Sequence, residues 1–237
     1  AQYLADIINI KILRHKVHET TALGAAFMAG LSIGVYKSLK DRITNRLQEF
    51  EELWSNGDNK HAFTELAFCI FTPQSSAKAC WDAILRLKEK GLLFKGRPEE
   101  LVPEMKRVRF SRKKSEFLVL ARENFYNSFN LKDKIESFSD SYQRREWLVK
   151  NVKGYGYKEA SHFLRNVGFA ENLAILDRHI LKNLVKNKVI DEVPKSMTKS
   201  VYLGIEKKMQ QFALEQDIRM DHLDFLFWYM EAKDIFK

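Results

Sequence analysis

Lys158 is the residue whose surroundings in the sequence most favour chemistry. It stands at the start of a helix in the stretch KGYGYKEASHFL, residues 153–164. At 3.6 residues per turn, His162 and Arg165 fall on the same helical face as Lys158, and the N-terminus of a helix carries a partial positive charge. Both effects disfavour a protonated ammonium, and a neutral lysine amine is a nucleophile. The alternative is an ordinary solvated lysine at a helix start.

The element that must position this lysine is a helix-hairpin-helix, predicted over about residues 145–168. One helix ends in EWLVKNV, a turn contains Gly154 and Gly156, and a second helix follows. Glycine is expected in such a turn because it adopts unusual φ values and lets backbone N–H groups approach a phosphate closely. A pair of glycines is common by itself. Lys158, and an aspartate nineteen residues later at Asp177, make the pattern specific.

Helical periodicity dominates the rest of the chain and predicts an all-α fold. Ile43, Leu47, Phe50 and Trp54 repeat at helical spacing, whereas alternating strand patterns are scarce. The run from Phe63 to Phe71 ends before Pro73. The other predicted helix starts are a cap at Ser75 or Ser76 for a helix that stops at Gly91, a cap at Ser111, and Asp221 with Asp224 at the last helix.

Residues 1–40 differ in amino-acid composition from residues 41–237, which predicts a domain boundary near Lys40. The first segment is rich in Ala and Gly, and the stretches AQYLADIINIKI and ETTALGAAFMAGLSIGVYKS resemble a C-terminal piece of glycerol kinases. The resemblance covers one helix and its lead-in, without any phosphate-binding loop. We therefore expect no kinase activity and regard the segment as a non-functional extension that packs on the following domain.

The charge of the chain favours a polyanionic partner such as nucleic acid. The sequence has 40 Lys+Arg against 31 Asp+Glu, a net charge of +9, and residues 41–237 retain 35 against 29. Basic residues concentrate in the segment KGRPEELVPEMKRVRFSRKK, residues 95–114. Arg109, Lys113 and Lys114 are its predicted contacts with DNA phosphate, and a solvated helix end is the alternative.

The sequence does not predict a metal-binding, cofactor-dependent or membrane-spanning protein. Cys69 and Cys80 are eleven residues apart in apolar surroundings, which matches no zinc or iron-sulfur spacing and indicates reduced core residues. The uncharged, mostly apolar run from Ala22 to Tyr36 has fifteen residues, short of the roughly 20 that a membrane span needs. The expected location is the cytoplasm, with binding to the nucleoid when the protein engages DNA.

Five stretches in one order resemble a known family, the compact, archaeal-type 8-oxoguanine DNA glycosylase/AP lyases of the helix-hairpin-helix superfamily. They are ELAFCIFTPQSSA, RFSRKKSEFLVLAR, LVKNVKGYGYKEASHFLRNVG, AILDRHIL and LDFLFWYMEAKDIFK. The resemblance spans about residues 41–237 and implies a two-subdomain fold with the active site in the cleft between the subdomains. One departure is the segment FAENLAILD, which lacks the Gly/Pro-rich loop typical of the wider superfamily.

The resemblance implies roles for two catalytic residues. Lys158 would attack C1′ of the damaged nucleoside, expel the base and hold the sugar as a Schiff base that undergoes β-elimination. Asp177 would stabilise the developing positive charge or help to move the lysine proton. A structural helix cap, or a partner for Arg178, is the alternative for Asp177.

It also implies roles in binding double-stranded DNA that contains 8-oxoguanine or an abasic site, by a monomer without a cofactor. Gln74 would enter the duplex where the extruded base leaves it, Phe110 and Trp228 would sandwich that base, and Lys237 would reach the base pocket with its ammonium and carboxylate. The alternatives are a turn amide for Gln74, core packing for the aromatic pair, and a frayed tail for Lys237.

Two other functions are alternatives to the 8-oxoguanine glycosylase hypothesis. A glycosylase of the endonuclease III type, acting on oxidised pyrimidines, shares the lysine and the aspartate. Such enzymes usually carry a four-cysteine iron-sulfur motif, which this sequence lacks. A non-catalytic DNA-binding hairpin protein would need the glycines and the basic residues, but it has no reason to keep both Lys158 and Asp177.

Overall fold

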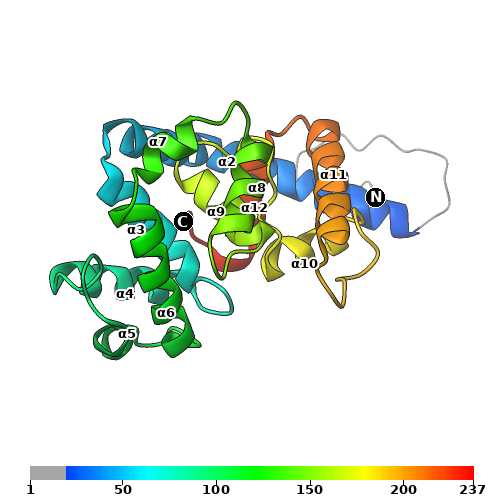
Figure 1. Cartoon of the computed structure of the whole chain (residues 1–237). Coiled ribbons are helices and arrows are strands. Elements are labelled where there is room, and N and C mark those ends of the chain that lie inside the picture. Colours follow the sequence, from blue (N-terminus) through cyan, green and yellow to red (C-terminus); the bar gives the residue numbers. More distant parts are fainter. Residues whose placement is uncertain (1–19) are drawn as a thin grey trace.

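Helices make up the regular structure of the part of the chain that the computed structural model describes, which is residues 20–237, with side chains from Gly34 onward (Figure 1). The helices are α2 (Thr20–Asn56), α3 (Asn59–Phe71), α4 (Ala77–Glu89), α5 (Pro98–Leu101), α6 (Ser111–Arg122), α7 (Leu131–Glu136), α8 (Ser141–Asn151), α9 (Tyr157–Asn166), α10 (Arg178–Lys186), α11 (Lys199–Glu215) and α12 (Met220–Ala232), with a 3₁₀ turn η1 (Val102–Glu104) and a π-helical turn η2 (Glu123–Asn127).

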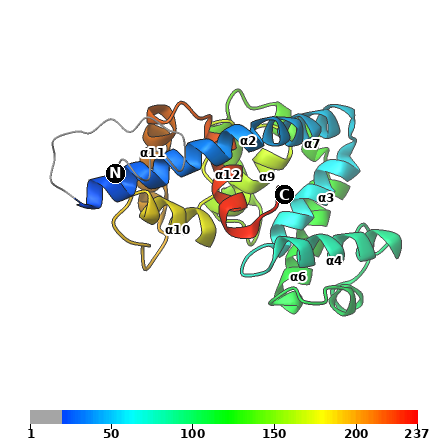
Figure 2. The same cartoon turned by 180° about the vertical axis from the view of Figure 1, so that it is seen from behind.

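Two separate hydrophobic cores divide these helices into two groups. One core contains buried residues between Trp54 and Leu173, and the other combines residues 39–50 with residues 174–227. In Figures 1 and 2, helices α3 to α7 lie at one end, α10 and α11 at the other, and the long helix α2 runs along both. The arrangement agrees with the predicted two-subdomain organisation, and α9 and α12 lie where the groups meet.

Local sequence signals explain most of the helix ends. Helix α3 stops at Phe71, two residues before Pro73, and the Ser76 side chain caps α4 by accepting from the Ala79 N–H at 3.1 Å. The predicted cap at Ser111 is wrong. That serine is the first residue of α6, and the preceding Phe110 adopts a left-handed conformation with φ of 58°. A backbone reversal at Phe110 therefore takes the place of a side-chain cap.

The predicted hairpin lies between α8 and α9, and its two glycines serve different purposes. Gly154 has φ of +89°, and a Cβ atom there would lie 2.5 Å from the Phe117 ring, so any side chain is excluded. Gly156 is extended, with φ of −107° and ψ of −171°, and its N–H donates to Glu159 Oε2 at 3.2 Å. The expectation of unusual φ is confirmed for Gly154 and wrong for Gly156.

The predicted boundary near Lys40 falls inside the continuous helix α2. On the N-terminal side of that position, Leu39 is buried in the second core, and the Tyr36 hydroxyl lies 3.1 Å from Nδ1 of His222 on α12. Residues 1–19 of the glycerol-kinase-like segment lie outside the described residues. In the described part of the chain, no helix combines the length and the apolar character needed to cross a membrane.

Candidate active site

Lys158 lies in the first turn of α9, and the hydroxyl of Thr72 orients its amine. Its Nζ donates to Thr72 Oγ1 at 3.2 Å, and the side chain keeps 22% of its surface exposed. Because the Thr72 hydroxyl itself donates to the Cys69 carbonyl at 3.0 Å, its lone pairs point to the lysine. The Glu159 carboxylate lies 3.5 Å from Nζ. The amine is thus fixed by Thr72, just after α3, and by Glu159 on α9, and it remains accessible.

The predicted stripe of positive charge along α9 is wrong, because its other two members are buried. Burial, followed by the charges of Arg165 and Lys158, lowers the pKa of His162 well below its usual value, so its ring is neutral. Within the described residues, neither ring nitrogen of His162 makes a hydrogen bond of standard geometry. The Lys237 backbone lies beside the ring, and Phe68 packs against it with 5.5 Å between the ring centres. Arg165 is paired with Asp224 at 2.8 Å. The face that a helical wheel shows as polar therefore packs into the interior.

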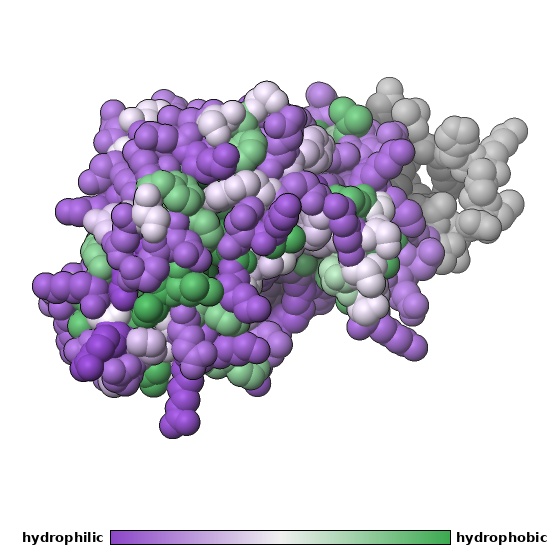
Figure 3. All heavy atoms as spheres, viewed as in Figure 1, coloured by the Kyte–Doolittle hydropathy of each residue, from purple (hydrophilic) through white to green (hydrophobic). Residues whose placement is uncertain are grey.

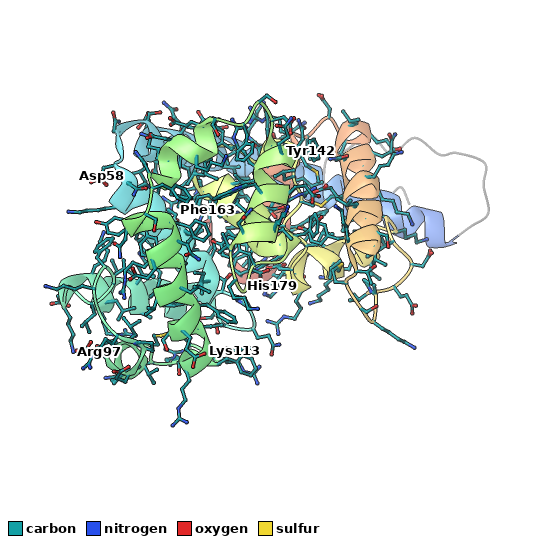
Figure 4. All side chains as sticks on the ribbon, in the orientation of Figure 1. Asp58, Arg97, Lys113, Tyr142, Phe163 and His179 are labelled. Carbon is teal, nitrogen blue, oxygen red and sulfur yellow. The ribbon has the colours of Figure 1, made fainter. Side chains whose placement is uncertain are left out.

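The apolar face of α9 is confirmed, and it anchors the site. Ala160, Phe163, Leu164 and Val167 are buried in the first core. Figure 4 places Phe163 in the interior, among side chains of the surrounding helices. Packing on this side holds the helix that presents Lys158.

Asp177 is the N-cap of α10, as the structural alternative for this residue proposed. Only one of its two carboxylate oxygens is used in the cap. Its Oδ1 accepts from the N–H groups of His179 at 2.8 Å and Ile180 at 2.9 Å. Within residues 20–237, Oδ2 makes no hydrogen bond. Capping fixes the orientation of the carboxylate and leaves one oxygen to face a developing positive charge.

Buried polar groups from α8 and α11 hold the loop that precedes Asp177, which lacks the usual Gly/Pro-rich sequence. The Tyr202 hydroxyl donates to the Ala174 carbonyl at 2.6 Å, and the Ala174 N–H donates to Glu206 Oε2 at 2.8 Å. Arg145 binds both oxygens of Glu206, at 2.5 and 2.8 Å. Sequence reasoning missed this network because each member looks like an ordinary surface polar residue.

Gln74 occupies the tip of the turn between α3 and α4. It is exposed and left-handed, with φ of 55°, a conformation that non-glycine residues adopt in a few per cent of cases. The neighbouring Ser75 Oγ accepts from the Arg109 N–H at 2.9 Å. The turn is therefore tied to the start of α6, and the Gln74 side chain is left outside.

Lys114 does not lie where the sequence predicted it. Its exposed fraction is 4%, and its Nζ donates to the Phe71 and Pro73 carbonyls and to Ser75 Oγ. A buried ammonium with three protein acceptors does not fit a contact with phosphate. Arg109 and Lys113 are exposed, as predicted, and Figure 4 shows Lys113 on α6 at the end of the molecule away from α11.

The two aromatic residues predicted for the base pocket lie in different environments. Phe110 is 59% exposed, so core packing does not account for it. Trp228 is partly buried, and its ring lies perpendicular to that of His179 with 4.9 Å between the ring centres. Its Nε1 is buried and has no hydrogen-bond partner among the described residues. Figure 3 shows a mostly polar surface on which apolar residues gather between α6 and the α8–α9 hairpin.

Lys237 is a buried residue rather than a frayed tail. Its Nζ lies 2.5 Å from Glu65 Oε1 and 4.0 Å from the centre of the Trp81 ring. Burial lowers the pKa of this lysine, and the Glu65 carboxylate opposes that shift. The prediction that the ammonium itself contacts the base does not fit this geometry, because Glu65 occupies it. Figure 1 shows the C-terminal segment ending between α3 and α9.

Comparisons with known proteins agree with this geometry. A family model described as 8-oxoguanine DNA glycosylase matches residues 43–218. An 8-oxoguanine DNA glycosylase/AP lyase of Fusobacterium nucleatum is 50% identical over 205 residues, which cover 86% of this chain and 94% of that protein.

Solved structures are similar over nearly their whole length. The crystal structure of Methanocaldococcus jannaschii 8-oxoguanine DNA glycosylase has a TM-score of 0.82 and 36% identity, covering 92% of this chain and 100% of that one. The complex of the same organism's enzyme with 15mer DNA containing 8-oxoguanine has a TM-score of 0.77 and 38% identity, covering 86% and 99%. The predicted all-helical, helix-hairpin-helix glycosylase fold is confirmed.

Proposed function

This chain belongs to the 8-oxoguanine DNA glycosylase/AP lyase family and excises 8-oxoguanine from DNA, and we propose that Lys158 and Asp177 carry out the reaction. The observation that carries the proposal is the placement of Lys158. Its amine is held by Thr72 at the start of the hairpin's second helix and remains partly exposed. The amine of Lys158 therefore has a fixed position and remains accessible to a DNA substrate.

Lys158 Nζ attacks C1′ with its lone pair, the bond from C1′ to the base breaks with its electron pair leaving on the base, and the proton released from Nζ passes to that base. The sugar ring opens to a Schiff base on Nζ. Loss of a C2′ proton then expels the 3′ phosphate by β-elimination, which nicks the strand, and water releases the lysine. The free oxygen of Asp177 stabilises the positive charge that develops on the sugar.

Base extrusion precedes this chemistry, because the target C1′ and base are not reachable inside a duplex. Gln74 enters the vacated space from its exposed position at the tip of the turn. Phe110 and Trp228 stack on the extruded base, and the Lys237 backbone contributes to the pocket while its ammonium stays with Glu65. Exposure of Phe110 and the unpaired Nε1 of Trp228 support this assignment.

DNA binding is assigned to the hairpin at Gly154 and Gly156 and to the exposed side chains of Arg109 and Lys113. Contacts of this kind recognise the backbone and carry no sequence information. The substrate is double-stranded DNA with 8-oxoguanine or an abasic site, bound by a monomer. The family match begins at residue 43, which supports a boundary near Lys40 and no catalytic role for residues 1–40.

Borohydride trapping on an 8-oxoguanine duplex tests the proposal. Borohydride reduces the Schiff base to a stable protein–DNA adduct, so the wild-type protein should form the adduct and Lys158→Gln should form none while still binding the duplex. An adduct formed by Lys158→Gln would assign the nucleophile elsewhere. A parallel duplex with an oxidised pyrimidine distinguishes the endonuclease III type of activity.

A further inference from the structure

Lys114 is a buried lysine whose partners all lie on one short turn. Its Nζ donates to the Phe71 carbonyl at 2.7 Å, the Pro73 carbonyl at 2.6 Å and Ser75 Oγ at 3.2 Å. An ammonium has three N–H donors, and here each has an acceptor on the α3–α4 turn, residues 72–75, or on the residue before it.

Its burial without a counter-ion calls for an explanation. In the described part of the chain, no carboxylate lies within salt-bridge distance of this ammonium, although burying a charge is unfavourable unless hydrogen bonds compensate for it. Burial lowers the pKa of Lys114 to about 8, and the titratable groups that face it are Lys158, Glu159, Arg109 and the Cys80 thiol, whose own pKa is raised to about 11. The side chain therefore remains mostly protonated at neutral pH.

The α3–α4 turn connects two parts of the proposed site. Thr72, at its start, accepts from the nucleophile Lys158, and Gln74, at its tip, has the left-handed backbone that directs its side chain outward. Lys114 binds the carbonyl before Gln74 and the hydroxyl after it. The ammonium thus fixes the backbone on both sides of the tip.

We propose that Lys114 is a positioning residue that preorganises the α3–α4 turn for DNA opening, so that Gln74 enters the duplex while Thr72 keeps the Lys158 amine in place. The proposal rests on the proposed function of Gln74 and Lys158. Loss of the ammonium leaves the Phe71 carbonyl with only the weak Cys80 thiol donor at 3.2 Å and the Pro73 carbonyl with only the Ser75 hydroxyl at 3.4 Å, which frees the turn to move. A displacement of about 1 Å at a reacting group is enough to lower a rate about 100-fold.

The test is Lys114→Met, which keeps the length and apolar character of the side chain and removes its three donors. Single-turnover excision of 8-oxoguanine paired with cytosine should fall about 10- to 100-fold. With the lesion opposite a tetrahydrofuran abasic analogue, the loss should be several-fold smaller, because no opposing base has to be separated and extrusion is easier. Lys88→Met, at an exposed lysine of α4, is the matched control and should behave as the wild-type protein on both duplexes.

A second measurement separates the turn from the chemistry. Fluorescence of 2-aminopurine placed opposite a tetrahydrofuran analogue reports DNA opening without any bond cleavage, and Lys114→Met should lower that signal even if Lys158 is not the nucleophile. Adding Gln74→Ala to Lys114→Met should cause little further loss of excision, since both changes disable the same turn. If Lys114→Met does not fold, Ser75→Ala, which removes one of the three acceptors, should show the same pattern with a smaller amplitude. Equal losses on the two duplexes, or no loss, would overturn the proposal.

Discussion

Glu65 on α3 and Lys237 in the C-terminal segment form a buried ion pair, with 2.5 Å between Oε1 and Nζ. The other oxygen of Glu65 accepts from the Asn166 side chain on α9 at 3.1 Å, and Arg165 next to it is paired with Asp224 on α12. Because Arg165 also donates to Asn166 Oδ1 at 3.3 Å, one chain of polar contacts joins three helices and the C-terminal segment. The position of Lys237 is set by this chain of contacts and not by the backbone alone.

Replacing Glu65 by Gln should strongly destabilise the protein. The change leaves the Lys237 ammonium buried without a counter-charge, and breaking one partner of a buried pair costs about 3–5 kcal/mol. Urea denaturation measures the loss, and Glu116→Gln, at an exposed carboxylate of α6, is the control. A loss below about 1 kcal/mol would mean that the pair contributes no more than a surface salt bridge does.

The variant Asp177→Asn separates the two roles of this side chain. Asparagine caps helices as well as aspartate does, so the melting temperature should change little, while the loss of the negative charge should slow base excision by about 100- to 1,000-fold. Asp177→Ala should lose the cap as well, at a cost of about 1 kcal/mol. Single-turnover kinetics and thermal unfolding on the same samples give both numbers, and an Asn variant with normal excision would leave Asp177 as a helix cap only.

The fold was predictable, and Lys158 could be singled out as a candidate nucleophile, because these signals are local. Helical periodicity, the residues before Pro73 and the spacing from Gly154 to Lys158 all act within a few turns of chain. The buried charges were not predictable, because their partners are distant: Lys237 and Glu65 are 172 residues apart, and Arg145 and Glu206 are 61 apart. A single sequence shows each of them as an ordinary surface charge.

Lys114 and His162 were misplaced for a related reason. Lys114 stands in a run of basic residues, and the run is exposed except where α6 turns this side chain toward the α3–α4 turn. His162 is on the polar side of a helical wheel, but α3 covers that side, and Phe68 meets its ring. A helical wheel identifies the apolar face of a helix. It does not show whether a second helix also covers the polar face.

The buried His162 makes stability depend on pH. Burial holds the pKa of His162 in the folded protein below its unfolded value of 6.5. As the pH falls below that value, the unfolded chain therefore binds more protons than the folded chain does. The contribution of this residue to stability is complete above about pH 6.5 and falls toward acid by at most about 1.4 kcal/mol per pH unit. His162→Leu should remove this dependence of the free energy of unfolding on pH. Urea denaturation of the wild-type protein and the variant from pH 7.5 to 5 measures the difference, and parallel curves of unfolding free energy against pH would contradict a neutral buried ring.

Removal of residues 1–33, most of the glycerol-kinase-like segment, should leave the enzyme active. A chain that begins at Gly34 retains the Tyr36 contact with His222 and the buried Leu39. Excision of 8-oxoguanine should stay within about twofold of the full chain, because the family match begins only at residue 43. A shortened chain that folds, by circular dichroism, and loses excision would show that residues 1–33 contribute to DNA binding.

The exposed Phe110 should matter for excision and little for folding. Because its ring is 59% exposed, Phe110→Ala should change the free energy of unfolding by less than about 1 kcal/mol. Loss of stacking on the extruded base is worth about 1–3 kcal/mol, which corresponds to roughly 5- to 150-fold in excision at subsaturating DNA. Cleavage of a preformed abasic site should be much less affected, because that substrate has no base to stack. Leu214→Ala, at an exposed leucine of α11, is the control for surface apolar residues, and equal effects of Phe110→Ala on both substrates would argue against a role in holding the base.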